Sequence, residues 1–167
     1  LCLAAKILGI KIFLIEPNMV LGRANKFFLN FLRKLICYSK NLINLPSGIN
    51  HKLTTIKPLI RKEYYDSGTY QKQDNLFTII IIGGSQGAKI FDELLNKSLI
   101  SIAKQVSIKI IHQTSEKNIN ILKNFYSQNN IENKVFSFDH NLNKVLKQGD
   151  LCITRAGASS LAELSFL

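Results

Sequence analysis

Apolar and polar positions along the second half of the chain change their period in a regular way. Short apolar runs alternate with stretches in which apolar residues recur at helical spacing. The predicted strands cover 76–82, 106–111, 134–138 and 151–154, and the predicted helices cover 88–104, 115–127, 141–147 and 158–167. Such alternation is typical of a parallel sheet covered by helices on both faces, so the predicted fold class is α/β.

The first third of the chain predicts a smaller set of elements. Residues 1–8 predict a helix closed by Gly9, and residues 10–15 predict a strand that ends at Glu16-Pro17-Asn18. A helix at 25–34 and strands at 35–38 and 53–56 are expected to follow.

The stretch YYDSGTYQKQDN, 64–75, is polar, contains glycine and has no clear period. It is the candidate linker between two domains, 1–63 and 76–167.

Apolar periodicity also predicts which side chains face the core of the second domain. On the helix at 88–104 these are Phe91, Leu94, Leu95 and Leu99, and on the helix at 115–127 they are Ile119, Ile121, Leu122 and Phe125.

Composition narrows the classes of protein without choosing one. Hydrophobic residues make up 46% and charged residues 20% of the 167, which favours a globular chain with a core. The net charge of +11 suits an anionic partner, and it is equally explained by an AT-rich genome that favours lysine. Three cysteines without a paired CxxC argue against a disulfide framework or a zinc site. No apolar run reaches the ~20 residues that a membrane-spanning helix needs.

The stretch IIIIGGSQGAKIF, 79–91, has two incompatible interpretations. Gly83-x-Ser85-x-Gly87 fits the nucleophile elbow of a hydrolase. A glycine-rich turn that opens a helix is also a place to hold a phosphate.

A hydrolase needs an acid and then a histidine after the serine. Before His112 the acids are Asp92 and Glu93, in the helix that the elbow opens, where they are poorly placed to orient a base. Asp139 is adjacent to His140, and consecutive residues rarely orient one another. No full triad is therefore expected.

A second turn of the same kind supports the phosphate interpretation. TRAGASSLAE, 154–163, is the end of a strand, a run of small residues and the start of a helix. Ser159 and Ser160 can cap this helix or donate to a phosphate, and Glu163 can complete a capping box with Ser160 or accept two ribose hydroxyls. GGSQGA lacks the G-x-G-x-x-G order of a dinucleotide site, which disfavours an NAD enzyme.

The motifs IIIIGGSQGAKIFDELL, IIHQTSEKN and CITRAGASSLAEL together resemble the MurG family of glycosyltransferases. LAAKILGIKIFLIEPN, near the start, is similar to the family's LAA…LGIPVVLHEQN. The resemblance covers nearly the whole chain and implies the GT-B fold, two Rossmann-like domains, with the end of the first and most of the second in this chain. It implies no catalytic metal and no cofactor.

The resemblance also implies an activity and its partners. N-acetylglucosamine would pass from UDP-N-acetylglucosamine to undecaprenyl-pyrophosphoryl-N-acetylmuramyl-pentapeptide, the lipid acceptor of peptidoglycan synthesis, with inversion at the anomeric carbon. The protein would be peripheral on the cytoplasmic face of the plasma membrane and would not bind nucleic acid. Another UDP-sugar transferase of the same fold and a non-catalytic remnant of a split gene are the alternatives.

Matching motifs carry the family's donor-site residues onto this chain. Asn18 would contact the donor sugar, Arg61 the donor, and Ser85 the diphosphate, while Asp139 would lie near the uracil. The helix start that would hold phosphate and ribose comprises Ala158, Ser159, Ser160, Leu161, Ala162 and Glu163. Asn18 is equally interpreted as a turn residue after Pro17, and Arg61 alone as a solvated charge.

The sequence departs from the family at several positions. HEQN is IEPN here, GNPVR is KPLIR with an extra residue before Arg61, and HQSGKG is HQTSEK. The family's general base lies in a loop expected before Leu1, and a donor-binding segment is expected after Leu167. No catalytic residue is therefore assigned, and a chain without both segments is not expected to turn over.

A membrane contact is expected from a basic and hydrophobic stretch at 26–34. Its candidate residues are Lys26, Phe27, Phe28, Arg33 and Lys34. An ordinary domain helix with solvated cations explains the same residues equally well.

Overall fold

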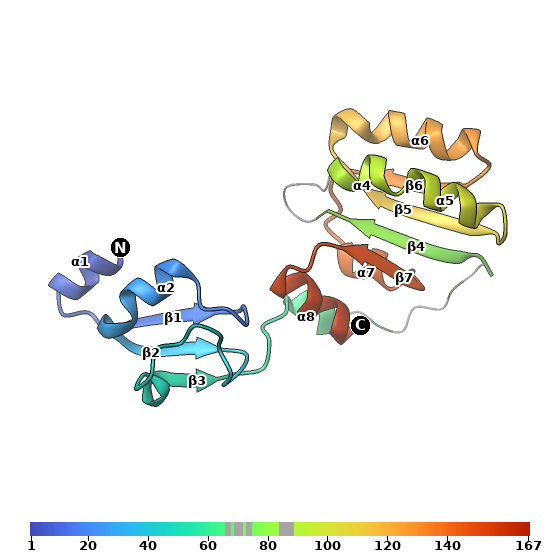
Figure 1. Cartoon of the computed structure of the whole chain (residues 1–167). Helices are drawn as coiled ribbons and strands as arrows, with labels where there is room; N and C mark the ends of the chain where they lie inside the picture. The colour runs from blue at the N-terminus through green and yellow to red at the C-terminus, as the bar shows by residue number, and fades with distance from the viewer. Residues whose placement is uncertain (66–67, 69–71, 73–74, 84–88) are drawn as a thin grey trace. The chain divides into compact units, whose positions relative to one another are not determined.

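The chain forms two units, Leu1–Leu59 and Ile60–Leu167, each built around its own parallel sheet (Figure 1). The computed structural model describes residues 1–65, 68, 72, 75–83 and 89–167. The division falls before the predicted linker because helix α3, Lys62–Tyr65, packs Tyr64 into the core of the second unit. Much of 64–75 lies outside the described residues, so the linker stays a prediction.

The first unit is a sheet in the order β1-β2-β3 with two helices. Its strands are β1, Ile12–Glu16, β2, Leu32–Cys37, and β3, Leu53–Thr55, and its helices are α1, Cys2–Ile7, and α2, Arg23–Phe28. Gly9 ends α1 at φ +67°, in the left-handed region that glycine adopts freely. The core contains buried Ile12, Leu29 and Leu35, and α1 itself buries no residue fully.

The predicted helix at 25–34 is wrong in its second half. Helix α2 ends at Phe28, a 3₁₀ turn covers Leu29–Phe31, and Leu32–Lys34 begin β2. Pairing decides this conformation, because Leu32 and Lys34 lie in register with Ile12 and Phe13 of β1. A partner that is distant in sequence overrides local helical spacing here.

The described residues of the second unit form four parallel strands in the order β6-β5-β4-β7. The strands are β4, Phe77–Ile82, β5, Ile108–Gln113, β6, Glu132–Phe136, and β7, Leu151–Thr154. The helices are α4, Lys89–Leu94, α5, Asn96–Ala103, α6, Ile119–Gln128, α7, Leu142–Leu146, and α8, Ala158–Phe166, with a 3₁₀ turn at Glu116–Asn118. The predicted parallel α/β alternation is confirmed.

Helices cover both faces of this sheet (Figure 1). Ile79 and Ile81 of β4 pack in the cluster that α5 and α6 cover, and Ile80 and Ile82 pack on the opposite side with α7. This period of two within an unbroken apolar run is what a strand buried on both faces requires.

Two of the side chains predicted to face the core are exposed. Leu94 is 66% exposed at the end of α4, because the predicted single helix is broken at Leu95 into α4 and α5. Ile121 is 65% exposed because the buried stripe of α6 runs instead through Leu122 and Tyr126. Among the described residues, no helix has the length and apolar content that a membrane span requires.

Candidate functional site

The order of the strands in the second unit marks one place at the carboxyl edge of its sheet. From β4 the chain adds β5 and β6 on one side and then returns to add β7 on the other. Ile82 and Thr154 are paired at the ends of β4 and β7, so Gly83 and Arg155 leave neighbouring strands. In open α/β sheets, ligands bind outside the carboxyl ends of strands at such a switch point.

Helix α8 begins at this place with an N-terminus open to a ligand. Its N-cap is Gly157, in an extended conformation at φ −72° and ψ 137°. Within the described part of the chain, no side chain caps this end of the helix. The helix dipole and the first backbone N–H groups, at 158–160, therefore favour an anion there.

The predicted capping box between Ser160 and Glu163 is not formed. Because the helix begins after Gly157, Ser160 lies inside the first turn rather than at the cap. Glu163 makes a different contact, with Arg61.

The structure brings two of the predicted site residues together, Arg61 and Glu163. Nε of Arg61 donates to Oε1 of Glu163 at 2.7 Å, and Nη2 donates to Oε2 at 3.1 Å. This two-bond geometry is the strong form of an arginine–carboxylate pair. The Glu163 side chain is only 12% exposed, whereas that of Arg61 is 53% exposed.

Tyr64 is a member of this cluster that sequence reasoning missed, because it stood at the start of the predicted linker. Its hydroxyl accepts a hydrogen bond from Nη2 of Arg61 at 3.0 Å. Burial and, after it, the interaction with the Glu163 carboxylate together raise the pKa of Tyr64 to about 12, although the Arg61 charge acts in the opposite direction. The hydrogen bond to Glu163 also raises the pKa of Arg61. A neutral phenol therefore lies beside a fixed ion pair. Arg61 directly precedes α3, and its separation of three residues from Tyr64 is the signal that could have found it.

Asn18 follows β1 in the first unit and is held by a buried carboxylate that sequence reasoning also missed. Nδ2 of Asn18 donates to Oε1 of Glu16 at 3.0 Å. The other oxygen of Glu16 accepts from the Gly22 backbone at 2.7 Å and from Asn25 at 3.0 Å. Glu16 is 2% exposed, and although burial opposes it, these hydrogen bonds lower the pKa of its carboxyl group. The feature of the sequence that could have indicated Glu16 is a single carboxylate at the end of an apolar strand.

The remaining predicted residues fall elsewhere. Asp139 follows β6, two strands away from β4, and its carboxylate accepts from the Asn141 backbone at 2.8 Å and lies 3.3 Å from Nζ of Lys134. Ser85 lies outside the described residues.

His112 and Asp92 lie together, contrary to the expectation that this acid is poorly placed to orient a base. Asp92 reaches the end of β5 from α4, and its Oδ1 lies 3.3 Å from Nε2 of His112. The Asp92 Oδ2 atom accepts from Thr114 and Asn118, each at 2.7 Å. Nδ1 of His112 is 2.7 Å from the hydroxyl of Tyr126.

The buried His112–Asp92 pair does not support a hydrolase active site. His112 is fully buried, and desolvation lowers its pKa to about 4 even though the Asp92 charge acts in the opposite direction. Its two ring nitrogens face Tyr126 and Asp92, so neither is available to a serine.

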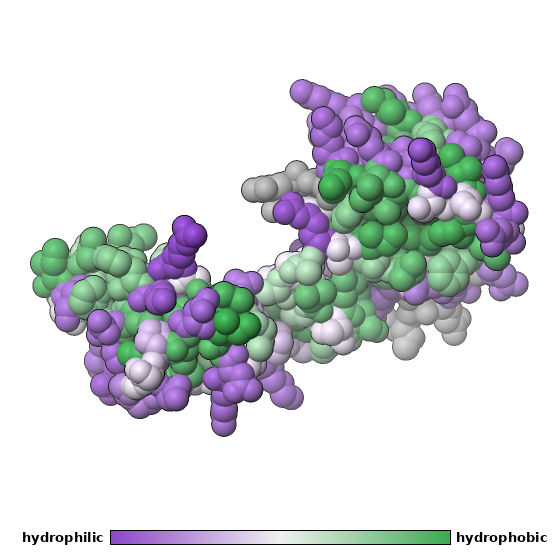
Figure 2. All heavy atoms as spheres, in the orientation of Figure 1, coloured by the Kyte–Doolittle hydropathy of each residue, from purple (hydrophilic) through white to green (hydrophobic). Residues whose placement is uncertain are grey.

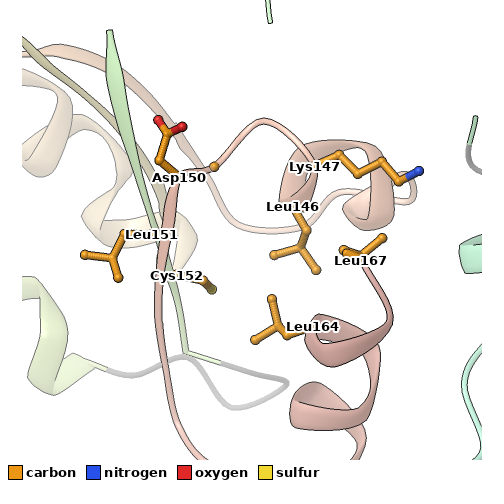
Figure 3. A pocket seen from close by; sticks show the side chains of 8 residues that line it. Leu146, Lys147, Asp150, Leu151, Cys152, Leu164 and Leu167 are labelled. Carbon is orange, nitrogen blue, oxygen red and sulfur yellow. The ribbon is translucent and has the colours of Figure 1, made fainter. Parts of the chain in front are cut away.

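The cavity in Figure 3 lies away from the carboxyl edge. It has a volume of about 610 Å³, and Leu146, Cys152 and Leu164 point into it from α7, β7 and α8. Its charged lining residues are engaged within the protein: Asp150 pairs with Lys72 and accepts from the Thr78 backbone at 2.7 Å, and Lys147 donates to the Gly68 carbonyl at 2.6 Å. A cavity whose charged groups already have partners does not compete with the switch point as a site. No group of three or more His, Cys, Asp or Glu that could hold a metal ion occurs among the described residues.

Comparison with known proteins identifies one family. The glycosyltransferase family 28 C-terminal domain matches residues 78–167. The UDP-N-acetylglucosamine–N-acetylmuramyl-(pentapeptide) pyrophosphoryl-undecaprenol N-acetylglucosamine transferase of Pelagibacter ubique is 47% identical over 166 residues, which are 99% of this chain and 47% of that protein. The protein of the same name from Rickettsia canadensis is 37% identical over 169 residues, 98% of this chain and 48% of its own length.

A solved structure gives the same result. The crystal structure of Acinetobacter baumannii MurG matches with a TM-score of 0.73 and 25% identity, covering 98% of this chain and 45% of that one. The predicted GT-B-type fold is thereby confirmed. The chain spans about half the length of the curated relatives it matches.

Proposed function

Because the chain belongs to glycosyltransferase family 28, we propose that it is part of a transferase that uses UDP-N-acetylglucosamine. The acceptor is undecaprenyl-pyrophosphoryl-N-acetylmuramyl-pentapeptide, which becomes the lipid-linked disaccharide of peptidoglycan synthesis. The names of the relatives support this substrate pair. The domain division at 64–75 is retained as part of the proposal.

One structural observation on this chain's own residues supports the proposal. The uncapped N-terminus of α8 and the Arg61–Glu163 pair lie together where β7 gives way to α8, beside the end of β4. A nucleoside diphosphate presents an anion and a vicinal diol, which are the two groups that a helix N-terminus and a carboxylate recognise.

The donor would be divided among these groups by their chemistry. The backbone N–H groups at 158–160 and the Ser159 and Ser160 hydroxyls would hold a phosphate, with Leu161 and Ala162 completing the first turns of α8. Glu163 would accept the ribose hydroxyls, and Arg61 would add positive charge near the diphosphate. Charge that develops on the leaving UDP would be stabilised by these fixed dipoles.

Three further residues are proposed to contact the donor. Ser85 would donate to the diphosphate from the glycine-rich turn after β4. Asp139 would contribute its backbone near the uracil, since its carboxylate is engaged locally. In the first unit, Nδ2 of Asn18 donates one of its two hydrogens to Glu16, and its amide oxygen and second N–H are the atoms proposed for a contact with the donor sugar.

A peripheral position on the cytoplasmic face of the plasma membrane is part of the proposal. Figure 2 shows hydrophobic residues gathered over α1, where Leu3, Ile7 and Leu8 are between 56% and 85% exposed. Phe27 on α2 is 68% exposed and Lys26 lies beside it. Apolar side chains with neighbouring cations suit an anionic lipid surface.

The predicted membrane stretch at 26–34 needs one correction. Arg33 and Lys34 lie on β2 rather than on a helix with Phe27, and Phe28 packs against the core. Lys34 donates to the His51 carbonyl at 3.0 Å. The described residues that support a membrane contact are therefore those of α1 and the exposed side of α2.

Isothermal titration with UDP-N-acetylglucosamine tests the donor site. Binding is expected for the wild-type chain and is expected to weaken about tenfold or more in Glu163→Gln, because the neutral amide loses half of its acceptor capacity. Glu132→Gln is the control, since its carboxylate lies on β6 and is half exposed. Equal affinity in wild type and Glu163→Gln would count against the assigned site.

A further inference from the structure

The phenol ring of Tyr64 is anchored in the core of the second unit. It is 2% exposed and belongs to the cluster that contains Ile80, Ile111 and Val145. Asn143 on α7 donates to the Glu63 carbonyl at 2.6 Å, which ties α3 to α7. The ring is therefore fixed by contacts other than the ion pair beside it.

The anchored ring restrains an arginine that would otherwise be mobile. Over half of the Arg61 side chain is exposed, and an exposed arginine gains little from a surface ion pair because it loses rotamer freedom. Here the guanidinium carbon lies 5.2 Å from the centroid of the Tyr64 ring, and Nη2 donates to its hydroxyl. The hydroxyl and the ring face together restrict where the guanidinium can lie.

The restrained guanidinium in turn orients Glu163. Both carboxylate oxygens accept from it. A carboxylate has about four acceptor sites, so a two-bond arginine leaves about two for other hydroxyls. A carboxylate whose orientation is already set loses less freedom when it binds a diol, and this raises affinity.

We propose that Tyr64 is a positioning residue of the donor site, which holds Arg61 against Glu163 so that the carboxylate is set to accept the ribose hydroxyls of a uridine diphosphate sugar. The inference rests on the proposed function of Glu163. It adds a residue whose hydroxyl accepts from Arg61 and also interacts with the Glu163 carboxylate itself.

Two ligands and two matched variants test this role. The ligands are UDP and its 2′,3′-dideoxy analogue, titrated into the wild-type chain, Tyr64→Phe and Tyr65→Phe. Tyr64→Phe removes only the hydroxyl and keeps the buried ring. Tyr65→Phe makes the same change one position later, where the ring is 63% exposed and stacks on Phe166.

The expected result is selective for the ribose. Wild type should prefer UDP over the dideoxy analogue, and Tyr64→Phe should weaken UDP binding about three- to tenfold, the effect of one lost hydrogen bond. Affinity for the analogue should stay within about twofold in Tyr64→Phe, which also shows that the variant is folded. Tyr65→Phe should change neither affinity.

Other results separate the inference from the proposed function. A wild-type preference for UDP that survives in Tyr64→Phe, or an equal loss for both ligands, overturns the positioning role alone. Equal binding of the two ligands by wild type, or no binding, overturns the proposed function and this inference with it.

Discussion

Lowering the pH is expected to destabilise the second unit through His112. The ring is fully buried, and desolvation is the main reason that its pKa falls from 6.5 to about 4. Well above pH 6.5 the histidine is neutral in both the folded and the unfolded chain, and its full contribution to stability is present. As the pH falls, the unfolded chain takes up a proton that the folded chain excludes, so the free energy of unfolding decreases until about pH 4.

The magnitude follows from the same two pKa values. Each pKa unit corresponds to about 1.4 kcal/mol, so the full loss is about 3 kcal/mol, of which about 2 kcal/mol is lost by about pH 5. The contacts agree with a neutral ring, since one tautomer lets the Tyr126 hydroxyl donate to Nδ1 and leaves the other N–H facing Asp92. Carboxylates with lowered pKa, such as Asp150, contribute mainly below this range.

The assay must report on the second unit alone, because two units can unfold separately. Urea titrations between about pH 7.5 and pH 5, read by hydrogen exchange of peptides that cover β4 and β5, meet this need. Between these pH values the free energy of unfolding of His112→Gln should change by about 2 kcal/mol less than that of wild type. His140→Gln, which changes an exposed residue, should behave as wild type. An unchanged free energy of unfolding between these pH values, or the same dependence in His112→Gln, would refute the reasoning.

Two substitutions test packing and buried hydrogen bonds. Gly149→Ala is expected to destabilise the second unit by about 1–3 kcal/mol, because the added methyl group would lie 2.5 Å from Cδ1 of the fully buried Ile80; a urea midpoint equal to that of wild type would contradict this. Glu16→Gln is expected to destabilise the first unit by about 1–3 kcal/mol, because a neutral amide cannot accept all four hydrogen bonds that Glu16 accepts. The control Glu132→Gln should lower the free energy of unfolding by less than about 1 kcal/mol. An equal loss of stability in Glu16→Gln and Glu132→Gln would contradict the structural role assigned to the Glu16 carboxylate.

The fold could be predicted where a local pattern and the tertiary contacts agree. Residues 79–82 form an unbroken apolar run, and all four side chains are buried on the two faces of the sheet. At 29–34 the pattern and the contacts disagree, because helical spacing continues through residues that pair with β1. Pairing between distant strands is a property of the whole fold and leaves little trace in a window of ten residues.

The site divides in the same way between local and distant contacts. The turn and the start of α8 are local features, so the sequence could place them at the end of a strand. The partner of Glu163 is 102 positions away, and the sequence offered ribose hydroxyls or Ser160 for this carboxylate but not Arg61. Tyr64 was missed for a related reason. The residues around it in the sequence are polar and have no period, whereas the side chains that bury its ring come from distant parts of the second unit.

Asp92 and Glu163 show why residue type and spacing do not settle the role of an acid. Both lie in the first two turns of a helix that follows a strand of the same sheet. Asp92 lies on the face that α6 covers and is enclosed with His112 and Tyr126, where its hydrogen bonds hold α4 to the end of β5. Glu163 lies on the opposite face, where it pairs with the half-exposed Arg61, the residue that precedes α3. Burial behind a neutral histidine makes the first a structural anchor, whereas pairing with a solvent-facing cation leaves the second within reach of a ligand. The side of the sheet, which follows from the strand order, therefore explains why one acid is enclosed and the other lies beside an exposed arginine, as its proposed role requires.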